Sequence, residues 1–393
     1  MASTTDTQVP ATESIEGDAL LVSVVIPCLN EAETIEECVV SARRVLAENG
    51  IAGEVVVADN GSTDGSAELA AAAGARVIHQ PERGYGSAYL AGFGAARGKY
   101  IVMADADLTY DFAEIPRFVK GLDEGADMVI GNRMENIQPG AMPWLHRYVG
   151  NPILTGILNL FFRTGVSDAH CGMRGIRRDV LPRLDLRSPG MEFASEMVIR
   201  ASKEHLDIRQ FPIEYHPRVG ESKLSTWSDG WRHLRFLLVH SPTHLFIFPG
   251  FAIGAIGTII TALAVGEVDV LGHKFQEHVL IGGSLLMIVG TQTIGMGVCA
   301  RAYGYFLMGE RSPVLDRFRL RYKLEDILLA GVAVLLAGLA AMVYVAIVWA
   351  NRGFGSLGEV RFAILGSTFF IIGIQIIFSA FLVSIIGLRR TSN

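Results

Sequence analysis

The second half of the chain contains four long apolar stretches without a charged residue, and these constrain its fold more than any other feature. They cover residues 245–265, 279–300, 327–350 and 363–388. A helix needs about 20 apolar residues to cross the hydrocarbon core of a bilayer, and each stretch is long enough. The sequence therefore predicts an all-α transmembrane domain of four helices over residues 244–393.

Basic residues between these stretches predict how the chain lies in the membrane. Segment 301–326 contains six Lys and Arg residues, whereas segments 266–278 and 351–362 contain one and two. Cytoplasmic loops carry an excess of Lys and Arg, so the positive-inside rule places segment 301–326 in the cytoplasm. Because the number of spans is even, the N-terminal domain and the C-terminal Arg389 and Arg390 are expected on the same side. We therefore predict a multi-pass membrane protein whose N-terminal domain and C-terminus are cytoplasmic.

The first 240 residues have a different pattern, in which short apolar runs alternate with helix-like segments. Strands are predicted at residues 21–27, 54–59, 76–79, 100–104 and 128–131, with helices at 31–49, 86–97, 112–124 and in an Ala-rich segment ending at 73. Strands that alternate with helices at this spacing indicate βαβ units and a mostly parallel sheet. We predict an α/β, Rossmann-like domain over residues 20–226.

Two carboxylates, Asp105 and Asp107, come directly after the predicted strand at 100–104. Ligands in open α/β sheets bind at the carboxyl ends of the strands, so we expect chemistry here. Paired carboxylates suit a hard divalent ion, Mg²⁺ or Mn²⁺, that also holds a substrate diphosphate. A solvated acidic turn is the alternative, because the Asp-x-Asp pattern is short.

Further acids follow the neighbouring strands. Asp59 ends the second predicted strand, and Glu31 lies just past the first. In a doubly wound sheet these side chains meet Asp105 at one crevice, where a carboxylate accepts hydrogen bonds from a nucleotide base or ribose. For Asp59 the alternative is a turn-forming role ahead of Asn60 and Gly61.

Composition limits the classes of partner. The formal net charge is −6 and the sequence has no basic stripe with interleaved aromatic residues, so we expect no nucleic-acid partner. The four cysteines have no CxxC spacing and are interpreted as free thiols in a reducing compartment. Residues 1–19 are polar and acidic without a signal-peptide pattern, and we expect a disordered tail.

Two segments in the middle of the chain are candidates for contact with the membrane surface. Residues 152–162 are strongly apolar but too short to span a bilayer. They form either a core helix or a helix in the membrane interface, with Trp144 and Arg147 beside it. Residues 227–243 are predicted to form an amphipathic interfacial helix that leads into the membrane, with Trp231 on its apolar face.

Four segments, in this order, resemble the family 2 inverting glycosyltransferases, whose nucleotide-sugar-binding domain has the type A fold. They are VVIPCLNEAETI, VVVADNGSTDGS, GYGSAYLAGFGAARGKYIVMADADLTYDF and MVIGNR. Within that family the chain is most similar to the branch of dolichol-phosphate mannose and glucose synthases. The resemblance covers residues 21–240 and is far more specific than any one of its motifs.

The resemblance implies where a nucleotide-sugar donor and its metal bind. Asp105 and Asp107 would hold Mg²⁺ or Mn²⁺ under the donor diphosphate. Many relatives have Gln where this chain has Thr109, which leaves a third protein ligand open, with water as the alternative. Asn60 replaces a second Asp found in many relatives. The donor-binding residues implied are Pro27, Leu29, Glu31, Asp59, Gly61, Ser62, Arg83, Asp105 and Glu192. For Glu192 the alternative is a favourable interaction with a helix dipole.

The resemblance also implies an acceptor side. The segment DAHCGMR, from Asp168, is similar to the D-x-x-x-G-x-R segment of the family, and Asp168 is the candidate for positioning the sugar or the acceptor. The segment RVGESKL is similar to the R-x-G-x-S-K-L loop of the synthases. Guanidinium groups bind phosphate through two hydrogen bonds, whereas an ammonium acts as a point charge. The acceptor or diphosphate would therefore contact Arg133, Arg218, Ser222 and Lys223, and the alternative for this loop is a basic surface segment. The catalytic set implied is Asp105, Asp107, Asp168, Arg133 and Arg218.

These expectations combine into one hypothesis and two alternatives. A hexose moves with inversion from GDP-mannose or UDP-glucose to a polyprenyl or dolichyl phosphate on the cytoplasmic face, and a homo-oligomer is compatible with this. A processive polysaccharide synthase is the first alternative, although residues 220–245 contain no Gln-x-x-Arg-Trp motif. A non-catalytic membrane scaffold is the second. Metal-dependent binding of a nucleotide sugar separates the enzyme hypotheses from the scaffold, which needs neither.

Overall fold

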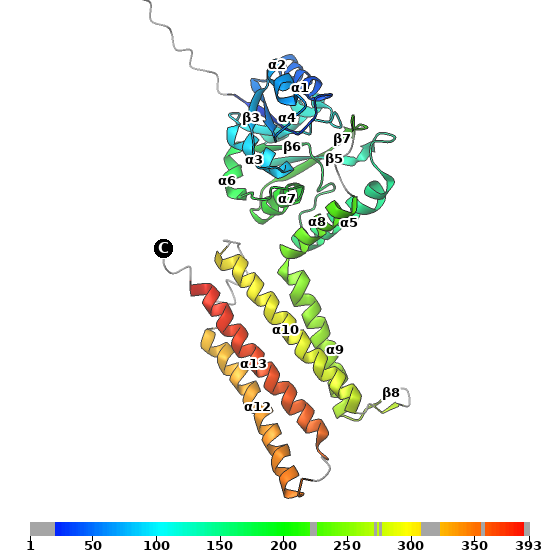
Figure 1. Cartoon of the computed structure of the whole chain (residues 1–393), viewed down its shortest axis with the longest axis vertical. Coiled ribbons are helices and arrows are strands. Elements are labelled where there is room, and N and C mark those ends of the chain that lie inside the picture. Colours follow the sequence, from blue (N-terminus) through cyan, green and yellow to red (C-terminus); the bar gives the residue numbers. More distant parts are fainter. Residues whose placement is uncertain are drawn as a thin grey trace, which may run out of the picture. The chain divides into compact units, whose positions relative to one another are not determined.

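The chain forms two compact units, Met1–Leu234 and Arg235–Asn393. The computed structural model describes residues 20–220, 226–270, 273–274, 277–307, 323–354 and 358–388, so the predicted tail at 1–19 lies outside the described residues. The first unit is a layered α/β domain and the second consists of long helices (Figure 1). The predicted fold class, a mostly parallel sheet followed by an all-α region, is confirmed. The units divide inside α8 (Thr226–Val239), which covers most of the predicted interfacial helix.

A seven-stranded sheet forms the centre of the first unit, in the order β3-β2-β1-β4-β6-β5-β7. Its strands are β1 (Val22–Cys28), β2 (Gly53–Asp59), β3 (Arg76–His79), β4 (Tyr100–Met103), β5 (Met128–Ile137), β6 (Arg174–Arg177) and β7 (Ile208–Tyr215). β1 pairs in parallel with β2 and β4, β2 with β3, and β5 with β7. β6 is antiparallel to both of its neighbours, β4 and β5. All five predicted strands are present.

Two strands, β6 and β7, have no clear signal in the sequence. β6 is only four residues long and begins and ends with arginine, which is not the pattern of a buried strand. β7 contains Pro212, which cannot donate a ladder hydrogen bond. Proline is tolerated because β7 is the last strand of the sheet, where one side of the strand has no partner strand.

Helices cover both faces of the sheet (Figure 1). α1 (Ile35–Glu48), α2 (Ser66–Ala72) and α4 (Ile115–Asp123) lie on one face; α3 (Tyr85–Ala95), α6 (Leu181–Leu184) and α7 (Phe193–Lys203) lie on the other. α1 shows why these segments are helical: it buries residues at helical spacing, from Ile35 through Val39 and Ala42 to Leu46. The helices thereby enclose the central strands in a single core.

The helix at the predicted 152–162 segment is not a core helix. In α5 (Asn151–Phe162) the buried side chains are Thr155 and Leu158. Leu160 is 68% exposed and Ile153 is 55% exposed, and the preceding Trp144 is 68% exposed. Exposed apolar side chains of this size, close to Arg147, are typical of a helix that lies in a membrane interface, and that role stays a prediction.

Within the described residues, four helices are long and apolar enough to cross a membrane: Thr243–Val265, Glu277–Phe306, Leu324–Asn351 and Val360–Gly387. They correspond to α9 (Phe248–Val265), α10 (Glu277–Leu307), α12 (Leu324–Asn351) and α13 (Val360–Leu388). A short pair of strands, β8 (Asp269–Val270) and β9 (His273–Lys274), lies between α9 and α10. A Cβ on Gly290 of α10 would lie 2.5 Å from the Gly254 nitrogen of α9, so the two backbones touch there. Small residues at such contacts are typical of helices packed in membranes. The protein is therefore a membrane protein.

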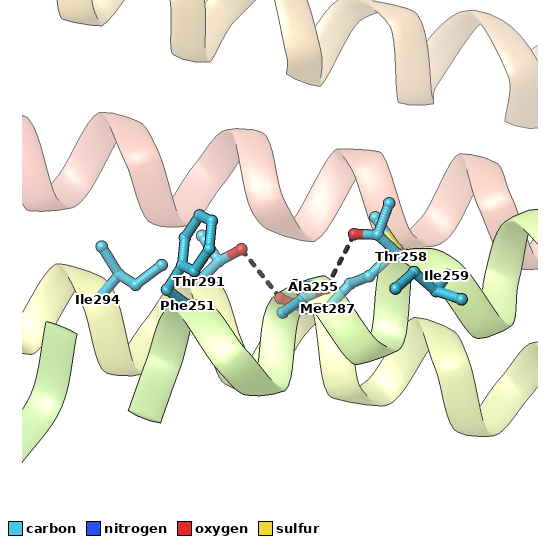
Figure 2. Close-up of a pocket in the computed structure, with 8 residues that line it drawn as sticks. Phe251, Ala255, Thr258, Ile259, Met287, Thr291 and Ile294 are labelled. Carbon is cyan, nitrogen blue, oxygen red and sulfur yellow. Dashed lines mark hydrogen bonds between the residues drawn. The ribbon is translucent and has the colours of Figure 1, made fainter. Parts of the chain in front are cut away.

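A groove of about 440 Å³ lies between α9 and α10 (Figure 2). It is lined by Phe251, Gly254, Ala255, Thr258, Ile259, Met287, Thr291 and Ile294, none of which is charged. Thr258 Oγ1 donates to the Gly254 carbonyl at 2.8 Å and Thr291 Oγ1 to the Met287 carbonyl at 2.9 Å, so both hydroxyls are used within their own helices. Such a lining cannot bind a nucleotide diphosphate, and the candidate active site lies in the first unit.

Candidate active site

The strand topology gathers the predicted site residues at one edge of the sheet. The parallel strands all end at this edge, and the antiparallel β6 begins there. Glu31 follows β1, Asp59 ends β2, and Asp105 follows β4. Arg133 lies in β5, and Asp168 precedes the start of β6. The sheet therefore brings these side chains together, as expected for ligands at the carboxyl ends of strands. Their roles stay predictions.

Asp105 is held by two tyrosines from α3. Tyr85 Oη and Tyr89 Oη donate hydrogen bonds to Asp105 Oδ1 at 3.0 and 3.2 Å. Desolvation and the Asp107 carboxylate raise the pKa of Asp105 to about 6, although the two tyrosine hydrogen bonds oppose this. Burial raises the pKa of both tyrosines well above the usual value, so their hydroxyls keep the protons that they donate.

Asp107 is fixed from its own loop and faces Arg218. The backbone nitrogen and Oγ1 of Thr109 donate to Asp107 Oδ1 at 3.2 and 2.5 Å. Arg218 Nη1 lies 3.4 Å from Asp107 Oδ2. Between the two acids, the Ala106 carbonyl accepts a hydrogen bond from Thr34 Oγ1 at 2.6 Å, which ties this loop to the start of α1. Thr109, where the resemblance left a third metal ligand open, therefore orients Asp107 through its hydroxyl.

The two carboxylates fit a hard divalent cation. Asp105 Oδ2 faces Gly172, where an added Cβ would lie 2.5 Å away, so the missing side chain leaves room at this oxygen. In the described ranges, no three His, Cys, Asp or Glu side chains gather as a complete metal site. Mg²⁺ is commonly held by one or two carboxylates, with water and substrate phosphates as its other ligands. Asp105 and Asp107 suit that mode of binding.

Arg218 connects two loops at this edge. Its Nη2 donates to Glu31 Oε1 at 2.9 Å, and its Nη1 lies beside Asp107. The backbone after β7 is held as well, because the nitrogen of Val219 donates to the Asp107 carbonyl at 3.3 Å. Arg218 is thereby placed beside both the predicted metal ligands and the loop after β1. Ser222 and Lys223, the other predicted phosphate-binding residues of this segment, lie outside the described residues.

Arg133 and Asp168 form a buried, doubly hydrogen-bonded ion pair. Arg133 Nε and Nη2 donate to the two Asp168 oxygens at 2.7 and 2.9 Å, and the Arg133 backbone nitrogen adds a third bond at 3.2 Å. The two residues are 7% and 1% exposed. Burial alone would raise the pKa of Asp168, but the Arg133 charge and hydrogen bonds outweigh it and hold this pKa below the usual range. The Arg133 guanidinium also lies 5.1 Å from the Tyr215 ring centre.

The predicted nucleoside side is built on Asp59 and Asn60. Asp59 accepts hydrogen bonds from the nitrogens of Gly61 and Ser62 at 3.3 and 3.0 Å, and it lies 3.1 Å from His79 Nδ1. Burial opposes the ionised form, but hydrogen bonding from the Ser62 side chain, together with these three contacts, holds the pKa of Asp59 below its usual value. The turn-forming alternative therefore describes part of what Asp59 does. To bind a nucleoside as well, Asp59 would have to accept further hydrogen bonds with the lone pairs that these contacts leave unused.

Asn60 links the end of β2 to the entrance of α3. Its Nδ2 donates to the carbonyls of Gln80 and Glu82 at 3.0 and 2.7 Å, and its Oδ1 accepts from the nitrogen of Gly84 at 2.7 Å. A carboxylate could not donate these first two bonds, which explains why Asn at this position suits this chain. Of the other predicted donor residues, Pro27 lies in β1, Leu29 directly follows it, and Arg83 is exposed.

Three buried side-chain atoms at this edge have no hydrogen-bond partner in the described part of the first unit: His170 Nδ1, Glu192 Oε2 and Arg218 Nε. Buried polar groups are nearly always paired, so each of these atoms is a candidate for contact with a ligand or with water. Glu192 directly precedes α7. Desolvation and the adjacent His233 lower the pKa of His170 to about 3, so its ring is neutral. His170 Nε2 and His233 Nδ1 both contact Ser195 Oγ, at 3.4 and 3.3 Å.

Tyr85, Tyr89 and His170 were not predicted as site residues. The two tyrosines are four positions apart and so occupy one face of α3. This spacing could have indicated their role. The helix begins at the ligand-binding edge of the sheet, so its first turn can place two side chains of one face beside Asp105. His170 has no such signal, because its contacts come from α7 and α8.

Comparison with known families matches two parts of this chain. A family model described as "Glycosyl transferase family 2" matches residues 23–184, and one described as "Glycosyltransferase family 2 C-terminal transmembrane region" matches residues 298–387. The first match contains Asp59, Asp105, Asp107, Arg133 and Asp168.

Curated relatives agree with the family models. The chain is 44% identical over 367 residues to the low-salt glycan biosynthesis hexosyltransferase Agl6 of Haloferax volcanii, covering 93% of this chain and 89% of that protein. It is 32% identical over 286 residues to the glycosyltransferase AglJ of that organism, covering 72% and 91%. It is also 34% identical over 210 residues to a dolichyl-phosphate hexose transferase of H. volcanii, covering 53% and 88%.

Proposed function

The chain belongs to glycosyltransferase family 2, and from this premise we propose that it transfers a hexose from a nucleotide sugar to a polyprenyl phosphate at the membrane. One observation carries the proposal: Asp105, Asp107 and Arg218 meet at the ligand edge of the sheet in a membrane protein. Acids that hold a cation, with an arginine beside them, suit a nucleoside diphosphate. The membrane helices suit a lipid acceptor. The names of two similar proteins, a hexosyltransferase and a dolichyl-phosphate hexose transferase, support the hexose and the lipid phosphate.

The donor is GDP-mannose or UDP-glucose in this proposal. Glu31 and Asp59 bind the nucleoside, and Glu192 faces the hexose with its unpartnered oxygen. Asp105 and Asp107 would hold Mg²⁺ or Mn²⁺. When bound, such an ion supplies positive charge that stabilises the diphosphate as a leaving group. Arg218 lies next to Asp107 and is therefore within reach of the same phosphates.

The reaction is a single displacement with inversion. An oxygen of the acceptor phosphate forms a bond to the anomeric carbon of the hexose. The bond from that carbon to the diphosphate oxygen breaks, and the nucleoside diphosphate leaves with the electron pair. A phosphate nucleophile is already anionic near pH 7, so no strong general base is needed. The residues of the site act by positioning and by stabilising charge, which are large terms in such transfers.

Arg133 and Asp168 have a positioning role in this proposal. Each charge is already neutralised by the other inside the core, so neither group is placed to neutralise a phosphate directly. The pair fixes the segment from Asp168 to Arg174 against β5, and this segment includes Gly172, which leaves room at Asp105. Lys223 shares the phosphate-binding role with Arg218.

The catalytic unit and the C-terminus face the cytoplasm in this proposal. The support is the number of basic residues: six in segment 301–326 against one in 266–278 and two in 351–362. A cytoplasmic site has direct access to nucleotide sugars. The exposed apolar side chains of α5, among them Ile153 and Leu160, suit contact with the membrane surface from which the lipid would enter.

A transfer assay tests the proposal. The purified full chain in detergent is incubated with Mn²⁺ or Mg²⁺, undecaprenyl or dolichyl phosphate, and radiolabelled GDP-mannose or UDP-glucose in parallel. We expect label to enter the organic phase with one donor, and the Asp105→Ala variant to lose this transfer. Asp111→Ala is the matched control, because Asp111 lies in the same segment but is exposed and caps a short helix.

Two results would contradict the proposal. A growing water-soluble polymer without labelled lipid would indicate a processive synthase. No turnover of either donor with either lipid would favour a scaffold role for this member of the family.

A further inference from the structure

Tyr85 and Tyr89 both contact Asp105, a role that the sequence pattern did not indicate. Both hydroxyls donate to the same oxygen, Asp105 Oδ1, at 3.0 and 3.2 Å. A carboxylate oxygen has two lone-pair positions, so the two tyrosines occupy both positions on Oδ1. Hydrogen bonds to an ionised acceptor are stronger than those between neutral groups. The orientation of the carboxylate is therefore fixed from one side.

The tyrosines are themselves held rigidly. Gly84, at the start of α3, has φ of +146°, and a Cβ there would lie 2.2 Å from the Pro189 carbonyl. Its nitrogen also donates to Asn60 Oδ1 at 2.7 Å. At the other end of the pair, the Tyr89 ring stacks on Phe193 of α7, with ring centres 5.7 Å apart and 5° between the planes. The hydroxyls thus reach Asp105 from a helix that has little freedom to move.

The second oxygen of Asp105 lies on a different side. Oδ2 faces Gly172, where a side chain would collide with it at 2.5 Å. The hydroxyl of Tyr110 is also close to this glycine, and it accepts hydrogen bonds from the Gly172 nitrogen at 2.7 Å and from Arg133 Nη1 at 3.5 Å. One oxygen is therefore occupied by tyrosines while the other is left clear by a glycine.

We propose that Tyr85 and Tyr89 are positioning residues that hold Asp105 by Oδ1, so that Oδ2 serves as a single-oxygen ligand of the divalent cation. The inference rests on the proposed function, because it assumes the Asp105–Asp107 metal site. It predicts that the two hydroxyls set the affinity for the metal without touching it. Partners behind a metal ligand typically change affinity by about 10- to 100-fold when they are removed.

Manganese binding tests this directly. MnCl₂ alone is titrated into the full chain in detergent, and free Mn²⁺ is followed by electron paramagnetic resonance for wild type, Tyr85→Phe, Tyr89→Phe and the double variant. We expect each single variant to bind Mn²⁺ several-fold more weakly and the double variant about tenfold or more. Phenylalanine keeps the ring and its packing, so only the hydroxyl is lost. In the transfer assay, excess Mn²⁺ should restore turnover of the double variant but not of Asp105→Ala.

Tyr100→Phe is the matched control. Tyr100 Oη also donates to a carboxylate, Asp123 Oδ1, at 2.7 Å, and Tyr100 is buried in β4. Removing it deletes the same kind of hydrogen bond away from the site, so Mn²⁺ affinity should stay at the wild-type value. Thermal unfolding of every variant shows whether the fold is retained.

The outcomes separate this inference from the proposed function. Wild-type binding that is lost in Asp105→Ala establishes the metal site itself. Given that site, unchanged Mn²⁺ affinity in the Tyr85→Phe/Tyr89→Phe double variant overturns the positioning role alone. No wild-type Mn²⁺ site at all overturns both the positioning role and the metal-dependent part of the proposed function. Equal weakening in Tyr100→Phe would assign the effect to general loss of stability and would also overturn the inference.

Discussion

Arg133 and Arg218 lie at the same edge of the sheet, but one is enclosed in the core and the other lies at the crevice. Arg133 is 7% exposed and gives two donors to Asp168, which is 1% exposed. The Arg218 side chain is 24% exposed and is shared between Glu31 and Asp107. The first arginine has one well-matched partner, whereas the second stands between two acids that belong to different loops.

This difference suits Arg133 to a structural role and Arg218 to contact with a substrate. The Arg133–Asp168 pair is complete without a ligand, and breaking it would leave a charge buried in the core. Arg218 is beside a carboxylate that we assign to the metal, and its Nε has no partner in the described part of the chain. In the proposed reaction, a cation bound to Asp107 would leave the guanidinium able to turn to the phosphates of the donor. Three predictions test this contrast.

The largest expected effect is on stability, from Arg133→Met. Methionine keeps much of the volume but leaves the Asp168 carboxylate buried without its partner. Removing one member of a buried ion pair typically costs about 3–5 kcal/mol of the free energy of unfolding. Unfolding is followed in detergent with a thiol-reactive dye, because Cys28, Cys38 and Cys171 are each at most 1% exposed in the folded protein. Burial raises the pKa of these thiols, to about 11 for Cys28, so they react little before unfolding.

Arg177→Met is the matched control for that measurement. Arg177 pairs with Asp179 at the surface, where the two side chains are 37% and 64% exposed. Exposed pairs contribute about 1 kcal/mol or less, so this variant should unfold close to wild type. If Arg133→Met were as stable as Arg177→Met, the buried pair would not be the structural element described here.

The second prediction concerns activity, from Arg218→Ala. Removing one group that stabilises charge in a transition state typically lowers kcat by about 100-fold or more, and we expect a loss of this size in lipid transfer. The unfolding free energy should change less than in Arg133→Met, because the Arg218 side chain is 24% exposed whereas Arg133 is enclosed in the core. Arg209→Ala is the control, since Arg209 lies in β7 but pairs with Asp207 and Glu124 at the surface. Normal turnover in Arg218→Ala, or a loss explained by unfolding, would contradict its assignment to phosphate.

Much of the fold is predictable from local patterns in the sequence. The five strands that were predicted are short apolar runs, and the four membrane helices follow from length and lack of charge. The convergence of Glu31, Asp59 and Asp105 follows from strand direction alone, because parallel strands end at one edge. β6 is different: it inserts antiparallel between β4 and β5, and nothing in its four residues indicates that position.

The partners of the site residues were much less predictable. Arg133 and Asp168 were both identified, but their pairing joins residues 35 positions apart and depends on β5 packing against the segment before β6. Tyr85 reaches Asp105 across 20 positions, and this depends on how α3 lies on the sheet. A motif in the sequence identifies a residue, whereas its role depends on contacts that exist only after the chain folds.

The smallest expected effect is on the pH dependence of stability. Its sign distinguishes an Asp168 carboxylate that is paired with Arg133 from one that is buried without a cation. In the wild type the pKa of Asp168 is held below its usual value by Arg133 against the effect of burial. The stability gained from a depressed pKa is present above the unfolded value, about 3.9 for Asp, and is lost as pH falls below it. In Arg133→Met the same carboxyl is buried without a cation, which raises its pKa. At neutral pH the unpaired Asp168 carboxylate therefore destabilises the variant. As the pH falls and Asp168 is protonated, this destabilisation decreases.

The destabilisation caused by Arg133→Met should therefore shrink between pH 7 and pH 4.5. Over this range the wild-type pair itself loses only about 0.1–0.2 kcal/mol, since the pH stays above the unfolded pKa of Asp. Most of the change thus comes from protonation of Asp168 in the variant. Other acids titrate in both proteins and cancel in the difference, which is followed at each pH by circular dichroism, because thiols react too slowly with the dye at pH 4.5. Arg133→Met/Asp168→Asn removes the titrating carboxyl, so its difference from wild type should change little over this range. A penalty for Arg133→Met that grew on acidification would mean that Asp168 does not carry the buried charge, and the contrast between the two arginines would fail.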